Sequence, residues 1–150
     1  MKHSSGGFTL MEMLIALIIV ALLASQAYPV FQQYVTRVRR QQAQSALLRL
    51  MQQEERYFTQ ANTYLAFSSS STGEQERLFQ WWSGTTQASS GYEIEGEACE
   101  GELISACVRL VATPGGADVD RTFHDPDCGQ LTLTSTGLRL ASGPATRCWP

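Results

Sequence analysis

Motifs that signal catalysis or phosphate binding are missing from this 150-residue chain. It contains no glycine-rich phosphate loop, no nucleophile elbow and no recognisable pair of catalytic carboxylates. Of its two histidines, His124 lies with Asp125 and Asp127 in a proline-containing segment that we interpret as an ordinary loop. Four cysteines are present but no Cys-x-x-Cys, which argues against a zinc site or a redox centre. We therefore expect a protein that is not an enzyme and that holds neither a metal nor a cofactor.

An excess of positive charge is also missing. The chain has 11 Lys and Arg against 14 Asp and Glu, for a formal net charge of −3. Proteins built to wrap nucleic acid are basic, so a nucleic-acid partner is not expected. Four arginines could still gather into a basic stripe: Arg109, Arg121, Arg139 and Arg147. The length allows one compact domain plus a tail, and a hydrophobic content of 43% argues against long disorder.

The apolar residues are concentrated near the N-terminus. Residues 8–28 are apolar except for Thr9, Glu12, Ser25 and Gln26. As a helix, this segment would be roughly 32 Å long, and the hydrocarbon core of a bilayer is roughly 30 Å thick. We therefore predict a membrane-spanning helix. An ordinary secretory signal peptide is the alternative, but the small-residue cleavage site that it requires is poor here.

Glu12 is the unusual residue of this helix, because a carboxylate in a membrane is costly and normally has a function. Its nearest candidate partner is a cation at the start of the helix. If the chain were cut between Gly7 and Phe8, the new α-amino group would lie about one helical turn before Glu12. That pair could form within one chain or between two staggered parallel helices, where it would set their register. The alternative is a lone carboxylate that extends to water at the interface.

Amphipathic spacing continues the helix beyond the membrane segment, to about residue 61. Pro29 should kink the helix or loosen it locally. Arg37, Arg39 and Arg40 follow, and we interpret them as part of a solvated helix face rather than as a phosphate-binding patch.

After residue 91 the period of the sequence changes from that of a helix to that of strands. Four short alternating segments are separated by turn residues, at 92–95, 107–113, 130–134 and 138–140. They predict an antiparallel meander with one face on the helix, and so an α+β fold. Before them, residues 62–90 predict a loop. Its paired tryptophans, Trp81 and Trp82, are interpreted as anchors onto the core, with a stacking platform for sugars or bases as the alternative.

All four cysteines lie beyond the membrane helix, at positions 99, 107, 128 and 148. An envelope protein would expose this part to an oxidising compartment, so we expect disulfides, for which three pairings are possible. A bond from Cys128 to Cys148 would close a loop of roughly 20 residues, pin the C-terminus and stabilise the fold by about 3 kcal/mol. A bond from Cys99 to Cys107 would tie the first two strands together.

Residues 6–15, Gly-Gly-Phe-Thr-Leu-Met-Glu-Met-Leu-Ile, resemble the prepilin processing motif of type IV pilins. The resemblance implies that residues 1–7 are a leader, that a prepilin peptidase cuts after Gly7, and that it methylates the amino group of Phe8. Glu12 matches the acidic residue of the family, and we assign it to filament assembly. Positively charged flanks of membrane helices normally face the cytoplasm, and here the arginines follow the membrane-spanning segment. Charge counting alone would therefore place the C-terminal side of the helix in the cytoplasm. We place the leader there instead, because the processing motif implies it.

Segments of the C-terminal half resemble PilE-like minor pilins of type IVa pili, namely Val-Ala-Thr-Pro at 111–114, Asp-Cys-Gly-Gln-Leu-Thr-Leu at 127–133, and Cys148 with Trp149. In that family the cysteines that match Cys128 and Cys148 bound the C-terminal disulfide loop. Cys99 and Cys107 do not belong to the family pattern, so we expect them to pair only because they are the two cysteines that remain.

The resemblance implies the type IV pilin fold. Its long N-terminal helix would cover residues 8–61, with 8–28 in the membrane or filament core and 29–61 amphipathic. A loop at 62–90 would lead to the four-stranded antiparallel meander and disulfide loop of residues 91–150.

The function implied is that of a minor pilin, a structural subunit that helps to assemble a type IV pilus for adhesion and twitching motility. Its partners would be other pilin subunits, contacted through the N-terminal helix, the prepilin peptidase and the inner-membrane assembly machinery. It would cross the inner membrane once, with its C-terminal domain in the periplasm, and then enter an extracellular pilus. Two alternatives are a pseudopilin of type II secretion, which as a rule lacks the cysteine-bounded loop, and a DNA-uptake pilin, which the acidic balance disfavours.

Overall fold

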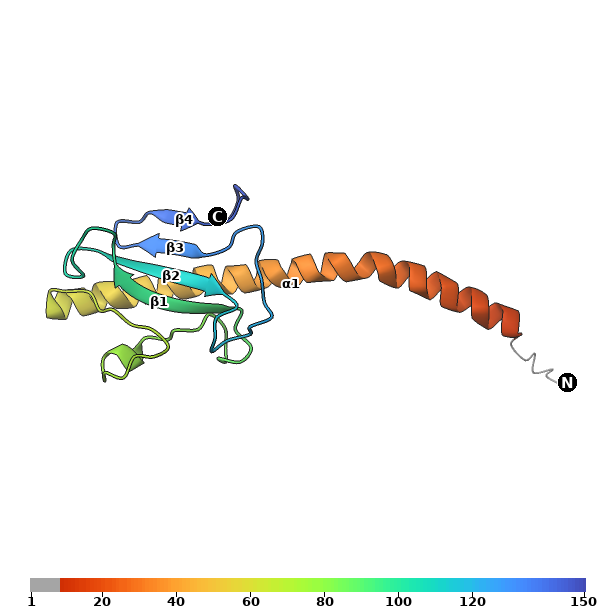
Figure 1. Ribbon diagram of the computed structural model, residues 1–150, viewed down its shortest axis with the longest axis horizontal. Coiled ribbons are helices and arrows are strands. Elements are labelled where there is room, and N and C mark those ends of the chain that lie inside the picture. The colour runs from red at the N-terminus through yellow and green to blue at the C-terminus, as the bar shows by residue number, and fades with distance from the viewer. Residues whose placement is uncertain (1–8) are drawn as a thin grey trace, which may run out of the picture. The chain divides into compact units, whose positions relative to one another are not determined.

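The computed structural model describes residues 9–150 and divides the chain into two compact units, Met1–Val35 and Thr36–Pro150. Residues 9–35 are called the N-terminal unit, and residues 36–150 are called the globular unit. Helix α1 (Leu10–Ala61) has residues in both (Figure 1). The other elements belong to the globular unit: η1 (Glu76–Leu78), β1 (Tyr92–Ala98), β2 (Val108–Pro114), β3 (Leu131–Thr134) and β4 (Arg139–Ala141).

The N-terminal unit is helical from Leu10 onward, and Thr9 caps it. The Thr9 hydroxyl accepts a hydrogen bond from the Glu12 backbone N–H at 3.2 Å, which gives one free N–H of the first turn a partner. Pro29 lies inside α1 without ending it. This part of α1 is long and apolar enough to cross a membrane, and none of its most apolar stretch is buried within the protein.

In the globular unit, α1 lies along one face of the sheet and contributes four buried residues to the core (Figure 1). Four small or apolar residues at helical spacing are fully buried: Ala43, Ala46, Leu47 and Leu50. They pack against apolar side chains that alternate along the strands, such as Ile94, Leu110 and Leu131. Alternation of buried and less buried residues is what a sheet with one covered face requires.

The sheet has the order β1-β2-β3-β4, and every neighbouring pair is antiparallel. Its register pairs Gly96 with Leu110 and Leu110 with Leu133, so these residues share one row across the sheet. The predicted α+β fold, a long N-terminal helix on a four-stranded antiparallel meander, is confirmed.

The outer edge of β1 is covered by the loop that precedes it. Phe67 pairs with Gly96, and Trp82 pairs with Glu93, as isolated bridges. The Phe67 ring lies where a side chain on Gly96 would be, since a Cβ there would come within 2.6 Å of it. Glycine at this position therefore lets the loop close over the edge, which would otherwise expose unpaired backbone groups.

Candidate functional site

The N-terminal unit exposes apolar side chains on every side of α1. Leu10, Ile15, Leu22 and Phe31 are each at least half exposed, although they are among the most hydrophobic residues of the chain. A water-soluble protein does not leave such a continuous surface bare, so it requires lipid or other apolar helices around it.

Glu12 lies in the first turn of this apolar helix. A carboxylate there is favourably placed near the positive end of the helix dipole. Thr9 and Glu12 also have the spacing of a capping box, a local signal that the sequence analysis missed. Within residues 9–150 the Glu12 carboxylate has no ion-pair partner. The predicted cleavage site at Gly7 and Phe8 lies outside the described residues.

The structure brings together both predicted cysteine pairs, Cys99 with Cys107 and Cys128 with Cys148. The second bond lies against α1, because the Gln44 side chain donates a hydrogen bond to the Cys148 carbonyl oxygen at 2.6 Å. The loop between Cys128 and Cys148 is therefore fastened to the helix as well as closed on itself.

Asp125 is the centre of a buried polar network that joins α1, β1 and the disulfide loop. Its two oxygens accept hydrogen bonds from Arg40 at 2.6 and 2.7 Å, a two-pronged charged pair. Tyr92 donates its hydroxyl and Cys128 its backbone N–H to the same carboxylate. Burial alone would raise the pKa of Asp125, but these donors outweigh it and hold the pKa below its ordinary value.

The sequence prediction that Arg39 and Arg40 belong to a solvated helix face is wrong. Arg40 does not lie on a solvated helix face, because its side chain is 13% exposed and holds Asp125. Arg39 likewise contacts Asp120 at 2.7 Å and lies over the Phe123 ring. The physical reason is that their acidic partners come more than 80 residues later and dock on the helix only in the folded chain.

Glu54 is a second buried carboxylate that sequence reasoning missed. Its side chain is completely buried on α1, like those of Ala43, Ala46, Leu47 and Leu50. One of its oxygens accepts the Leu65 backbone N–H at 3.0 Å, and the other has no partner within the described chain. Burial raises its pKa from 4.5 to about 7, against the lowering effect of the Leu65 hydrogen bond.

Two surface grooves flank the exposed side of α1 in the globular unit. The arginine groove has a volume of about 390 Å³ and is lined by Arg37, Arg40, Gln41, Gln44, Arg147, Trp149 and Pro150. Within residues 9–150, neither Arg37 nor Arg147 has an ion-pair partner. Trp149 is held in place by a hydrogen bond from its indole N–H to the Leu140 carbonyl oxygen at 2.8 Å.

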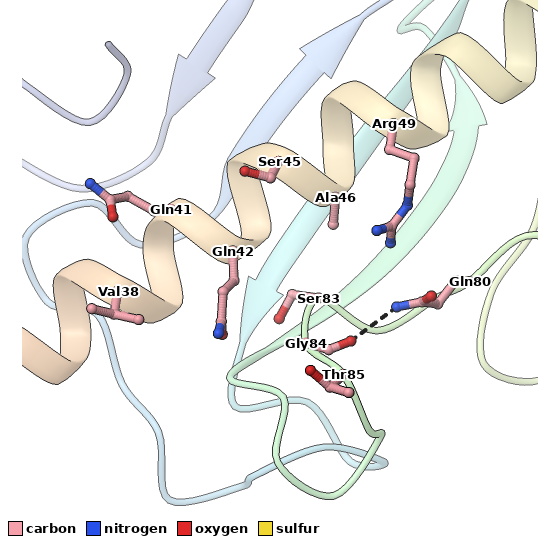
Figure 2. Close-up of a pocket in the computed structure, with 10 residues that line it drawn as sticks. All are labelled: Val38, Gln41, Gln42, Ser45, Ala46, Arg49, Gln80, Ser83, Gly84 and Thr85. Atoms are coloured by element: carbon pink, nitrogen blue, oxygen red, sulfur yellow. Dashed lines mark hydrogen bonds between the residues drawn. The ribbon is translucent and has the colours of Figure 1, made fainter.

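The second groove, the amide groove, shares Gln41 with the first and has a volume of about 480 Å³. Figure 2 shows its two walls, α1 on one side and residues 80–85 on the other. Gln80 holds the second wall together by donating a hydrogen bond to the Gly84 carbonyl oxygen at 3.1 Å. The side chains that line this groove are amides, hydroxyls, short apolar groups and Arg49, with no carboxylate.

Two sequence families match the chain. The family described as "Type IV minor pilin ComP, DNA uptake sequence receptor" matches residues 29–132. The prokaryotic N-terminal methylation motif matches residues 2–25. No curated protein matches the chain.

Two solved structures are similar to the chain. One is a type IV pilin from Shewanella oneidensis, with 25% identity and a TM-score of 0.47 over 77% of this chain and 98% of that one. The other is the non-core minor pilin PilV of Neisseria meningitidis, with 20% identity and a TM-score of 0.49 over 77% of this chain and 94% of that one.

The methylation motif and the exposed apolar helix behind it fit a prepilin that is held in the inner membrane and then assembled into an extracellular pilus. The family match covers more than half of the chain, including the second half of α1 and most of the sheet. The chain therefore belongs to the ComP family of type IV minor pilins.

Proposed function

We propose that this minor pilin enters the pilus through the apolar surface of its N-terminal unit, and that Glu12 acts in that assembly. Its partners are then the N-terminal helices of other pilin subunits, after a prepilin peptidase has cut between Gly7 and Phe8 and the inner-membrane machinery has extracted the mature chain. The observation that carries the proposal is a helix whose hydrophobic side chains are exposed on every side.

The role of Glu12 follows from the energetics of such a surface. A charged carboxylate weakens membrane insertion, so it persists only where it forms a useful contact. In an apolar filament core a pair between Glu12 and the amino group of Phe8 gains attraction but loses hydration, and the two effects largely cancel. The main value of the pair is then to fix the axial register of neighbouring helices.

Two substitutions separate this role from helix capping. Glu12→Gln retains a side chain that can complete a capping box with Thr9 but removes the charge, whereas Glu12→Val removes both. If pairing is the function, both variants should be processed and held in the membrane like the wild type but recovered poorly from sheared pili. The measurement is the amount in sheared pili divided by the amount in membranes. Normal recovery of Glu12→Gln would contradict the pairing.

A second candidate function is DNA capture, because the matching family is described as a DNA uptake sequence receptor. The net charge of −3 does not prevent it, since the arginine groove brings unpaired Arg37 and Arg147 beside Trp149. Arginines bind phosphates and an indole can stack on a base. The adjacent amide groove offers glutamines and Arg49, the side-chain types that read base edges.

The test is binding of a short DNA duplex to the full mature chain in zwitterionic micelles over a range of salt concentrations. Arg147→Gln should weaken binding and lower the slope of log affinity against log salt by about one unit. Arg121→Gln is the matched control, because Arg121 is exposed and outside both grooves. Equal losses in the two variants would show that the arginine groove is not the DNA site.

A further inference from the structure

A third cavity lies in the loop between α1 and β1, apart from both grooves. It has a volume of about 250 Å³ and lies between η1, the serines at positions 68 and 71, and the two adjacent tryptophans. Its lining combines aromatic rings with charged and hydroxyl groups: Ser71, Glu76, Arg77, Gln80, Trp81 and Trp82. The proposed pilus functions use none of these residues except Gln80, whose side chain supports the amide groove.

The floor of the cavity is anchored in the core and so is largely preformed. Phe79, which lines it, is buried and stacks on Phe67, with ring centroids 5.0 Å apart. The backbone of the tryptophan segment is joined to β1. The Trp81 carbonyl oxygen accepts the Ile94 N–H, and the Ser83 N–H donates to the Tyr92 carbonyl oxygen. A site held from two sides loses little conformational freedom when a ligand binds.

The tryptophans provide apolar faces rather than a slot. The rings of Trp81 and Trp82 are nearly perpendicular, with an interplanar angle of 80° and centroids 5.1 Å apart. A flat base cannot be sandwiched between perpendicular rings, but the C–H face of a sugar can lie on one of them. The buried indole N–H of Trp82 also has no acceptor among residues 9–150. Because that atom is buried within the protein, a ligand would meet the ring faces and not this N–H.

The polar groups of the cavity favour a neutral ligand with several hydroxyls. One Glu76 oxygen accepts the Gly73 N–H at 3.3 Å, and its other oxygen can accept from a ligand. Arg77 is exposed and has no ion-pair partner within the described chain, so it can donate. Glu76 would repel a phosphate group and Arg77 would attract it, so the two charges together favour a neutral ligand.

The size of the cavity suits a ligand of one ring. At roughly 30 Å³ per water molecule the cavity has room for about eight waters, which is less than the usual range of pockets for larger organic molecules. We propose that this cavity binds a single pyranose residue of a glycan, with one ring face on a tryptophan and its hydroxyls on Glu76 and Arg77. The site would give the pilus subunit a contact to glycosylated surfaces.

The chain offers an internal control, because it has three tryptophans and only two line the cavity. Full mature chain labelled with fluorotryptophan, in micelles without sugar headgroups, should give three fluorine NMR signals. These are titrated with methyl glucopyranoside, methyl galactopyranoside, methyl N-acetylglucosaminide, thymidine monophosphate and glycerol. We expect one pyranoside to shift the Trp81 or Trp82 signal saturably in the millimolar range, and to leave Trp149 unmoved.

Two isosteric variants test the role of the carboxylate. Glu76→Gln should weaken pyranoside binding about tenfold, because it removes a hydrogen bond to a charged group. Glu74→Gln, at an exposed position outside the cavity, should bind like the wild type.

The proposal is overturned if no pyranoside gives a saturable shift, if all three signals move together as with glycerol, or if Glu76→Gln binds normally. Tighter binding of thymidine monophosphate at Trp81 or Trp82 would replace it by a nucleotide site. None of these outcomes bears on the assembly role of Glu12.

Discussion

Replacing Glu54 by glutamine should change how the stability of the globular unit depends on pH. The folded chain holds this carboxyl in a dry environment with a pKa of about 7, whereas the ordinary value is 4.5. Between pH 4.5 and about pH 7 the folded state therefore binds more protons than the unfolded state. Stability should therefore fall as the pH rises through this interval.

The size of the effect follows from the shift in pKa. A difference of about 2.5 units at roughly 1.4 kcal/mol per unit corresponds to about 3 kcal/mol, complete above about pH 7. Glu54→Gln removes this titration. Its amide oxygen can still accept the Leu65 N–H, while its NH₂ group is buried without a partner at a pH-independent cost of about 1–3 kcal/mol.

The assay is urea unfolding of the full chain in micelles from pH 5 to pH 8, followed by tryptophan fluorescence. The wild type should be the more stable protein at pH 5. Its advantage over Glu54→Gln should fall by about 2–3 kcal/mol between pH 5 and pH 8. Glu100→Gln is the control, because Glu100 is exposed and is not among the groups that shift the pKa of Glu54. A difference between wild type and Glu54→Gln that stays constant with pH would refute the reasoning.

Three further outcomes are expected. Asp125→Ala should lower the free energy of unfolding by about 3–5 kcal/mol, measured by urea unfolding, because it leaves the largely buried charge of Arg40 with only the more distant and exposed Asp127 as a partner. Cys148→Ser should cost about 3 kcal/mol in the same assay, and peptide maps of the wild type should show Cys128 bonded to Cys148. Gly7→Glu should block processing, and intact-mass analysis should show the leader still attached; a mature N-terminus at any position other than the next residue would contradict the assigned cut.

Local patterns in the sequence were enough to predict the elements of the fold. The helix was expected to end near residue 61 and does so at Ala61. The four strands lie within one to three residues of the predicted segments, because their alternation reflects one buried face. The disulfide pairs could be proposed because spacing and family resemblance restrict them strongly.

Polar residues whose partners are distant in sequence could not be predicted in the same way. Arg40 and Asp125 each look like surface residues when read locally, and only the folded topology makes them a pair. Glu54 lies in a run of polar residues near the end of α1, where nothing local shows that Leu65 will fold back onto it. The cavity at Trp81 and Trp82 was considered from the sequence only as the weaker alternative, since composition cannot tell an anchor from a binding surface.

The contacts of α1 in the globular unit also determine when the chain can fold. Gln44 contacts Cys148, and Arg40 contacts Asp125, across separations of 104 and 85 residues. Contacts between such distant residues form slowly, because a long loop must close before they stabilise anything. These two contacts therefore cannot form until residues 125–148 have been translocated. Export must therefore be nearly finished before the native fold is complete, and the partly folded chain is the species most exposed to aggregation.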